Sequence, residues 1–154
     1  MSLNGEAFIF NPTAPEPPTR YAHARLAPTT AHRTIYVSGI ACVRPDTGEW
    51  PGCTPNPASP TGWDLDVRVQ TAAVLENIDN ILKNATGGKG GVQNLIDAVV
   101  YVVDMDRDYQ GMNEEWNKVF PTRSVAPARA TVGVKSLPDK RMLVEIKAVA
   151  VVDM

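Results

Sequence analysis

The sequence has few of the residues that build metal centres, disulfide frameworks or membrane spans. It contains two cysteines and two histidines in 154 residues, with no close pair of either type at metal-ligand spacing. We therefore predict no metal site, and unpaired thiols at Cys42 and Cys53 in a reducing compartment. No stretch approaches the roughly 20 apolar residues that cross a bilayer. Because residues 1–18 lack the basic and apolar regions of a secretory signal, a cytoplasmic location is the default expectation.

An excess of one charge is also missing. Fifteen basic residues stand against 17 acidic ones, a formal charge of -2, without the basic runs that follow phosphates. Nucleic acid is therefore not the expected main partner. The glycine-rich stretch at 86–91 is not a P-loop, because Lys89 is followed by Gly90 instead of a hydroxyl residue for magnesium.

What the sequence does contain fits a single globular domain over residues 1–154. Hydrophobic residues make up 44% and charged residues 21%, values typical of a protein with a packed core. Residues 1–18 predict an irregular N-terminal segment. Five prolines between residues 44 and 63 exclude a continuous helix or central strand. This stretch predicts a long surface loop, a kind of segment that often serves as a lid or binding loop.

The spacing of apolar residues predicts two helices and four strands. The first helix, of about five turns, follows a capping-like pair at Thr61 and Asp64 and ends at the glycines of 86–91. The second covers 106–120, where large apolar residues recur every three or four positions. The predicted strands are 34–40, 95–105, 128–135 and 141–152. This order predicts an α+β fold in which two helices pack on one face of a mixed sheet.

The last two predicted strands carry charged residues between apolar ones. We expect them to pair as a hairpin through the turn at 136–141. Because side chains alternate across a strand, Arg129 and Thr131 then stand beside Glu145 and Lys147 in every permitted register. Arg129 and Glu145 would be close enough to share one small ligand. The expected core faces hold Ala128, Ala130, Val132 and Val134 in the first strand and Val144, Ile146, Ala148, Ala150 and Val152 in the second.

A solvated face with surface ion pairs is the plain alternative for these charges, each pair contributing about 0 to 1 kcal/mol. Against it, Leu143, Val149 and Val151 lie on the same side as Glu145. That face is too apolar to be left in water along its length. We expect a second subunit to cover it.

The segment "YAHAR" repeats this pattern near the N-terminus. Tyr21, His23 and Arg25 alternate with alanines, so a strand here would present three polar side chains on one face. That face is either a second basic cluster for an anion or the solvated side of an edge strand.

Three stretches of the sequence resemble one known family. "YVSG", "DYQGMNEEWNKVF" and "PARATVGVKSLPDKRMLVEIKAVAV" are similar to the RidA/YjgF group of reactive enamine and imine deaminases, from about Tyr21 onward. "YAHAR" and "LVEIKAVA" resemble the 2-aminomuconate deaminase branch, whereas the loop 44–63 is longer than the family's usual connection. The resemblance implies a chorismate-mutase-like α+β fold. It also implies a homotrimer, or a dimer of such trimers, with ligand sites in clefts between subunits.

The resemblance further implies roles for individual residues. Arg129 would bind a substrate carboxylate, and Glu145 would be the acid that positions water. Thr131 stands where many members have cysteine, so no thiol is expected to take part, although the backbone near it would donate to the ligand. The other residues expected to bind substrate are Tyr21, Ser38, Gly39, Ile40 and Asn113.

These roles predict a hydrolase acting on a C–N bond without a cofactor. Arginine grips a carboxylate through its planar, always charged fork, which suits a 2-amino-2-enoate. Water adds to C2 of the iminium tautomer and ammonia leaves, so the reaction needs a proton carrier such as Glu145. We predict deamination of a 2-aminomuconate-like enamine or imine to a 4-oxalocrotonate-like 2-oxo product, with His23 or Arg25 holding the distal carboxylate. The alternatives are a broad deaminase of 2-iminobutanoate and 2-iminopropanoate, and a non-catalytic trimeric metabolite-binding module.

Overall fold

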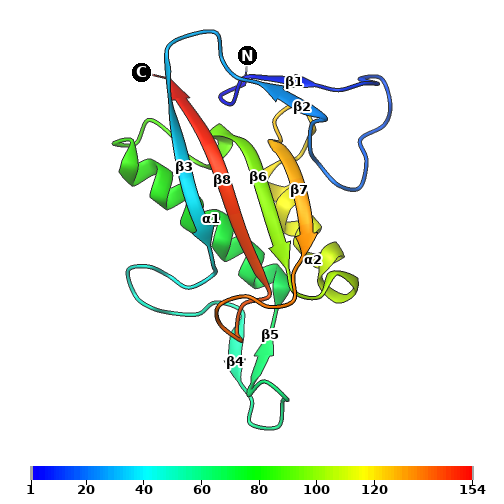
Figure 1. Ribbon diagram of the computed structural model, residues 1–154, viewed down its shortest axis with the longest axis vertical. Helices are drawn as coiled ribbons and strands as arrows, with labels where there is room; N and C mark the ends of the chain where they lie inside the picture. Colours follow the sequence, from blue (N-terminus) through cyan, green and yellow to red (C-terminus); the bar gives the residue numbers. More distant parts are fainter. Residues whose placement is uncertain (1, 154) are drawn as a thin grey trace.

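A four-stranded sheet with both helices on one side forms the body of the computed structural model, which describes residues 2–153 (Figure 1). From one edge to the other, the strands are β3 (His32–Ile40), β8 (Val144–Asp153), β6 (Leu95–Val102) and β7 (Ala128–Gly133). β8 runs antiparallel to both of its neighbours, whereas β6 and β7 are parallel. The predicted mixed α+β sheet is confirmed.

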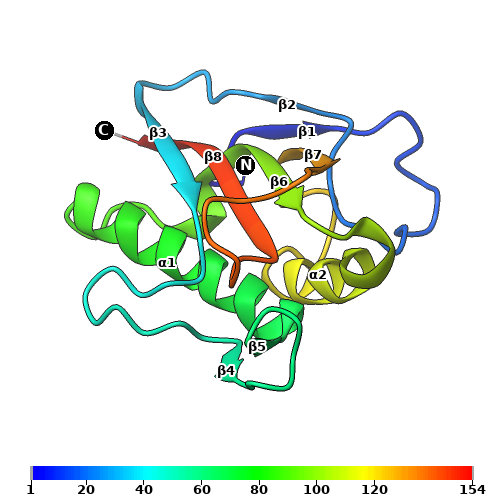
Figure 2. The ribbon, with the colours of Figure 1, turned by 60° about the horizontal axis from the view of Figure 1, so that its bottom comes forward.

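The helices cover one face of this sheet, the helix face, and leave the other face open (Figure 2). They are α1 (Val67–Ala85) and α2 (Met105–Val119), and a short 3₁₀ helix, η1 (Val92–Asn94), precedes β6. The core lies between the helices and the sheet. Its largest fully buried side chains include Trp116, Phe120, Leu75 and Ile78. Neither of the two helices described for residues 2–153 is long and apolar enough to span a membrane.

Two short ribbons extend from the ends of the sheet (Figure 1). β1 (Glu6–Phe8) pairs with β2 (Ala24–Leu26), and β4 (Cys53–Pro55) pairs with β5 (Trp63–Leu65). The predicted irregular segment 1–18 therefore contains a strand within its described part. The stretch 44–63, predicted to be a long loop, contains β4 and the first residue of β5.

The first helix begins later than its sequence signal predicts. Asp66 is the capping residue, and its side chain accepts hydrogen bonds from the backbone N–H groups of Arg68 at 2.9 Å and Val69 at 3.1 Å. The predicted capping pair at Thr61 and Asp64 is wrong. Asp64 belongs to β5, whose pairing with β4 keeps the chain extended until residue 66.

The last two strands are not neighbours, because β6 lies between β7 and β8. α2 joins β6 to β7, and a strand–helix–strand connection brings its two strands side by side in parallel. The chain then passes the end of β6 to begin β8 (Figure 1). The predicted hairpin between 128–135 and 141–152 is therefore wrong.

The register places Arg129 and Thr131 on the helix face. Ala98 and Val100 of β6 are fully buried beneath the helices, and they align with these two residues of β7. Val132, expected in the core, is instead 41% exposed on the open face. The predicted facing of this strand is wrong because alternation shows which residues share a face, but not which face meets the helices.

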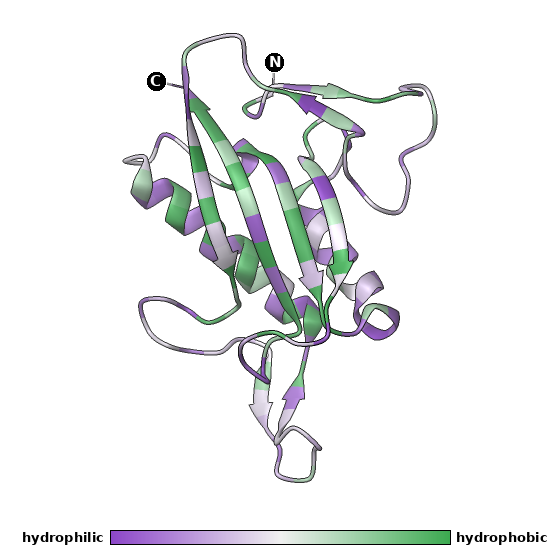
Figure 3. Cartoon of the chain, viewed as in Figure 1, coloured by the Kyte–Doolittle hydropathy of each residue, from purple (hydrophilic) through white to green (hydrophobic). Residues whose placement is uncertain are grey.

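Glu145 and Lys147 lie on the open face, which Figure 3 views directly. They align with Tyr101 and Val99 of β6. The predicted core face of this strand is confirmed, since its members are all buried: Val144, Ile146, Ala148, Ala150 and Val152. β8 therefore turns its even-numbered residues toward the helices, whereas β7 turns its odd-numbered ones.

Candidate functional site

Arg129, the second residue of β7, is surrounded by aromatic side chains on the helix face. Its guanidinium carbon lies 4.8 Å from the ring centre of Trp116 and 5.4 Å from that of Tyr21. Its Nη1 lies 3.9 Å from the sulfur of Met112. The faces of aromatic rings attract a cation without neutralising it. These neighbours therefore hold the guanidinium in place and leave its charge available.

No carboxylate within residues 2–153 forms an ion pair with Arg129. Burial lowers the pKa of its guanidinium, and the hydroxyls of Tyr109 and Tyr21 oppose that shift. Arg129 is half-buried, with its Nε fully buried. Arginine keeps its charge in proteins, and a charge that is partly removed from water without a partner is unfavourable. The surroundings of Arg129 thus favour binding of an anion.

Three buried polar atoms on β7 and the facing side of α2 lack a hydrogen-bond partner. They are Arg129 Nε, Thr131 Oγ1 and Asn113 Oδ1, three of the five such atoms in the described part of the chain. Buried polar atoms are nearly always hydrogen-bonded in native proteins. An N–H donor, a hydroxyl and an amide carbonyl are therefore left for a ligand. We call the following residues the arginine cluster: Arg129, Thr131, Asn113, Tyr21, Tyr109 and Trp116.

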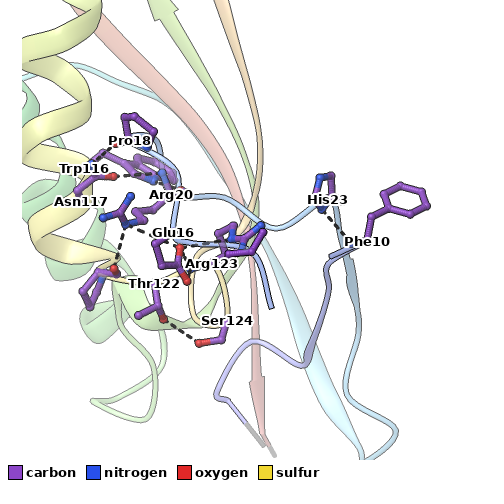
Figure 4. A network of polar contacts seen from close by, with 12 residues as sticks. Phe10, Glu16, Pro18, Arg20, His23, Trp116, Asn117, Thr122, Arg123 and Ser124 are labelled. Atoms are coloured by element: carbon purple, nitrogen blue, oxygen red, sulfur yellow. Dashed lines mark hydrogen bonds and ion pairs between the residues drawn. The ribbon is translucent and has the colours of Figure 1, made fainter. Parts of the chain in front are cut away.

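Residues 14–23, which we call the strap, are fixed to α2 by hydrogen bonds (Figure 4). Trp116 Nε1 donates to the carbonyl of Arg20 at 2.6 Å. Asn117 Nδ2 donates to the carbonyl of Pro18, also at 2.6 Å. The strap consequently runs along α2 beside the arginine cluster and reaches the edge of the sheet at β7.

The strap also brings Tyr21 to Arg129. The next residue, Ala22, forms a parallel bridge with Ala128 at the start of β7, so Tyr21 is held at the edge of the sheet. A hollow of about 350 Å³ lies between the strap and α2. Its lining residues are Pro18, Thr19, Tyr109, Gln110, Asn113, Glu114 and Asn117. The arginine cluster thus adjoins space for a small molecule.

Glu145 lies on the open face against Gly39 of β3. A methyl group on Gly39 would lie 2.8 Å from the carboxyl carbon of Glu145 and 3.0 Å from each carboxylate oxygen. β3 is irregular between Val37 and Ile40, where Ser38 and Gly39 interrupt the regular pairing with β8. Glycine is therefore the residue that leaves room for the carboxylate. We call Glu145, Gly39 and Ser38 the glutamate shelf.

The arginine cluster and the glutamate shelf lie on opposite faces of the sheet. Arg129 faces α2, Glu145 faces away from both helices, and β6 separates their strands. The prediction that these two residues share one ligand within a chain is therefore wrong. The prediction required two adjacent strands that both turn their even-numbered residues toward the helices. In the structure β6 lies between the two strands, and β7 turns its odd-numbered residues toward the helices.

Comparison with known proteins decides which family carries this arrangement. The profile of the family described as Endoribonuclease L-PSP matches residues 11–152. The chain belongs to this family, the RidA/YjgF family. Its relatives include the RutC family protein of Aquifex aeolicus, 31% identical over 93% of this chain and 97% of that protein. Another is a RutC family protein of Pyrococcus horikoshii, 34% identical over 92% and 94%.

Solved structures of RidA/YjgF proteins show the same fold. The crystal structure of Escherichia coli TdcF with bound serine has a TM-score of 0.59 at 28% identity, over 88% of this chain and 95% of that one. The Rid protein YyfB of Yersinia pestis has a TM-score of 0.69 at 23% identity, over 92% and 96%, and shows the fold alone. The predicted YjgF-like fold is confirmed. The 2-aminomuconate branch stays a prediction.

In this RidA/YjgF protein, Arg25 holds the N-terminal residues in place. Its guanidinium N–H groups donate at 2.5 to 3.2 Å to acceptors on Ser2, Asn4, Gly5, Ser124 and Ala126. Burial lowers the pKa of this guanidinium. An arginine has five N–H donors, and all are engaged here. None is left for the distal carboxylate that the sequence assigned to it.

His23 and Ile40 also lie apart from the two clusters. The backbone N–H of Phe10 donates to His23 Nδ1 at 3.3 Å, at the outer end of the strap and away from Trp116 (Figure 4). Ile40 aligns with Ile146 on the helix face and packs against the core. Of the two alternatives for "YAHAR", the second basic cluster therefore does not form.

The sequence did not single out Tyr109, Met112 and Trp116 as neighbours of Arg129. Their spacing is that of one side of an amphipathic helix, which predicts burial and not a ligand site. Met112 and Trp116 are fully buried, whereas Tyr109 is 36% exposed. The available signal was topological. A helix that joins two parallel strands packs on both of them, so residues on its inner side meet the inward side chains of the second strand.

The two thiols are unsuited to nucleophilic chemistry. Cys42 and Cys53 are both free, as predicted. Burial raises the pKa of Cys42 to about 12 and also raises that of Cys53. The thiolate is the reactive form, so both groups stay protonated at neutral pH.

Proposed function

We propose that this protein is a cofactor-independent deaminase of a carboxylate-bearing enamine or imine. The observation that carries the proposal is the state of Arg129, a half-buried cation without an acidic partner beside unsatisfied polar atoms. Such a site is suited to one carboxylate and one neighbouring N–H or O–H group. Membership of the RidA/YjgF family supports the same reading.

The reaction needs one anion site and one proton carrier. Protonation of a 2-amino-2-enoate at C3 gives the 2-iminium acid, and water then adds at C2. A proton moves from the added oxygen to nitrogen, the C–N bond breaks, and ammonia and a 2-oxoacid are released. Arg129 would hold the carboxylate throughout, and Glu145 would deliver and collect the protons.

Because the two groups lie on opposite faces, we infer that they meet between copies of the chain. The arginine cluster borders the β7 edge of the sheet, and the glutamate shelf stands on the open face near β3 at the other edge. The open face carries exposed apolar residues, including Tyr36 at 76% and Val132 at 41%. A head-to-tail contact that buries this face closes into a ring. A homotrimer, or a dimer of such trimers, is the expected assembly.

For the substrate we propose a 2-aminomuconate-like dicarboxylate. The rings of Tyr21, Tyr109 and Trp116 around Arg129 offer flat apolar surfaces to a conjugated carbon chain. Lys147 is exposed on the same face as Glu145. It is therefore placed to meet the distal carboxylate, in the role first expected of His23 or Arg25.

A broad 2-iminoacid deaminase is the second candidate. The relative TdcF was crystallised with serine, a small amino acid with a single carboxylate. The same Arg129 and Glu145 would serve such a substrate, while Lys147 would have no partner. A third candidate, a metabolite-binding module without turnover, would bind a 2-oxoacid and release no ammonia from any enamine.

Ammonia release from freshly generated substrates tests the proposal. We expect turnover of 2-aminomuconate, and a loss of at least about 10²-fold in Arg129→Ala, because a bidentate contact is removed. Arg68→Ala, which removes an exposed arginine paired with Glu114, is the matched control and should keep the rate. Faster turnover of 2-iminobutanoate than of 2-aminomuconate would favour the second candidate.

Mixed assemblies test whether the site is shared. Arg129→Ala and Glu145→Gln should each be inactive alone. Refolded together, they should recover about a quarter of the wild-type rate per chain, since random mixing pairs an intact Arg129 with an intact Glu145 at that frequency in a head-to-tail ring. No recovery in mixed assemblies of proven composition would contradict the shared site.

A further inference from the structure

Two buried amide side chains on α1 face the ends of the strands that form the glutamate shelf. They are Gln70 and Asn77, which are 0% and 2% exposed. They are seven positions apart in the sequence, which is about two helical turns, so they lie on the same side of the helix. A buried amide is retained where it satisfies backbone groups that would otherwise lack partners.

Gln70 holds the chain just before Glu145. Its Nε2 donates to the carbonyl of Arg141 at 2.7 Å, and its Oε1 accepts from the N–H of Leu143 at 2.9 Å. The same Nε2 lies 3.4 Å from the sulfur of Cys53. Both backbone contacts fall within four residues of Glu145. Gln70 therefore fixes the segment that leads into β8.

Asn77 holds the chain just after Gly39. Its Nδ2 donates to the carbonyls of Ala41 at 3.0 Å, Cys42 at 3.3 Å and Val43 at 3.0 Å. These residues follow directly on the end of β3. Asn77 therefore fixes the segment that leads out of the irregular part of this strand.

The proline-rich segment supports the first of these contacts from outside. The guanidinium carbon of Arg141 lies 3.7 Å from the ring centre of Trp50 and 5.4 Å from that of Trp63. Asp139 pairs with the same guanidinium at 2.8 Å. Residues 139–143 are thus held between α1 on one side and the proline-rich segment on the other.

The glutamate shelf needs such support because the strand ladder is interrupted there. Regular pairing of β3 with β8 stops at Val37 and resumes at Ile40, so it does not fix Gly39 against Glu145. The tolerance is small, since a single methyl group on Gly39 would touch the carboxylate at 3.0 Å or less. A shift of either segment would change the distance between the two residues.

We propose that Gln70 and Asn77 are positioning residues for Glu145. One amide sets the entry to β8 and the other sets the exit from β3, and together they keep the carboxylate on the α-carbon of Gly39. The proline-rich segment acts as the outer support of this arrangement. The proposal rests on the proposed function only in giving Glu145 the role of proton carrier.

Gln70→Met and Asn77→Leu test this proposal, because each removes the hydrogen bonds and keeps a similar volume. Thr71→Val is the matched control, since Thr71 is also buried on α1 but bonds only to the carbonyl of Val67 within the helix. Amide hydrogen exchange should rise over residues 141–146 in Gln70→Met and over residues 38–44 in Asn77→Leu. It should rise over neither segment in Thr71→Val.

Kinetics then separate positioning from simple support. Each amide variant should lower kcat at least about tenfold with KM within about twofold, because the contact to Arg129 is untouched. Gly39→Ala, which keeps both amides and displaces the carboxylate directly, should lower kcat in the same way.

Two outcomes would overturn the proposal. One is increased exchange with kcat unchanged, and the other is exchange that changes equally over both segments. If the wild-type protein released ammonia from no enamine, the proposed function would fail and this proposal would still be tested. The ¹³C chemical shift of the Glu145 carboxyl group, measured at one fixed pH, should then differ from the wild-type value in Gln70→Met and match it in Thr71→Val; identical chemical shifts in all three proteins would refute it.

Discussion

The arginine cluster and the glutamate shelf are built by different means. The arginine cluster draws side chains from the strap, α2 and β7, and these enclose Arg129 on the helix face. The glutamate shelf stands on the open face and depends on a glycine, a strand irregularity and two buried amides beneath it. The first is therefore ready to hold an anion, whereas the second needs a covering surface. This difference indicates why one chain can carry both halves of a site and still need a partner.

The largest expected effect is the loss of turnover in Glu145→Gln. We expect kcat to fall about 10²- to 10⁴-fold, the usual contribution of a general acid–base group. Binding of 2-oxobutanoate, measured by calorimetry, should stay within about twofold because Arg129 is intact. Arg129→Ala should also lose turnover, but it should in addition abolish that binding. Asp97→Asn, an exposed acid on the same face, is the control. Equal losses of 2-oxobutanoate binding in Glu145→Gln and Arg129→Ala would mean that the glutamate shelf and the arginine cluster do not have separate roles.

Trp116→Ala should have the largest effect on stability. Trp116 is fully buried and packs against both Arg129 and Phe120, so its truncation should lower the free energy of unfolding by about 3–5 kcal/mol. Phe10→Ala removes a large aromatic ring that is 79% exposed and should cost less than about 1 kcal/mol. Urea denaturation at one fixed protein concentration checks both values. Similar losses of unfolding free energy in the two variants would mean that Trp116 of the arginine cluster contributes no more packing than the exposed ring of Phe10.

The cap at the start of α1, the helix that carries Gln70 and Asn77, should contribute less to the free energy of unfolding than Trp116 does. Asp66→Ala removes the capping oxygen and should lower the free energy of unfolding by about 1 kcal/mol. Asp64→Ala, at the capping position predicted from the sequence, should change it by less than about 0.5 kcal/mol. A larger loss in Asp64→Ala would place the helix start earlier than residue 66.

The smallest expected effect concerns pH. Hydrogen bonds from Arg141 hold the pKa of Asp139 at about 2, below its ordinary value. A depressed carboxyl pKa contributes stability above about pH 4, and that contribution is lost as the pH falls toward 2. Tryptophan fluorescence should report loosening of Trp50 and Trp63 in this range. Asp139→Asn should lack the transition, and a transition that persists in it would have another origin.

Most of the fold could be predicted because the spacing of apolar residues in the sequence shows which side of each helix or strand is buried. The apolar spacing in 67–85 and 105–119 gave both helices, and alternation gave the buried face of β8. The facing of β7 could not be derived in the same way. Ala128, Ala130 and Val132 are small and apolar like core residues, whereas the long side chain of Arg129 turns toward the helices, where the rings of Trp116 and Tyr21 accept its flat guanidinium.

The candidate site could be predicted in its parts and not in its assembly. Arg129, Tyr21 and Asn113 lie on the helix face, and Gly39 meets Glu145 on the open face. Which parts belong together depended on strand order, which a single sequence specifies only through its connections. Arg25 was misread because a cation on an alternating strand has the same appearance whether it binds a ligand or, as here, the backbone carbonyls of the protein.

The bridge between Ala22 and Ala128 has a consequence for solubility. Exposed strand edges recruit other chains and start aggregation, and β7 is such an edge. By pairing with its first residue, the strap shields one end of this edge and leaves the remainder for a specific contact. A chain shortened past residue 23 would retain the four-stranded sheet with that end uncovered. We expect precipitation to be its first defect, before any change in chemistry.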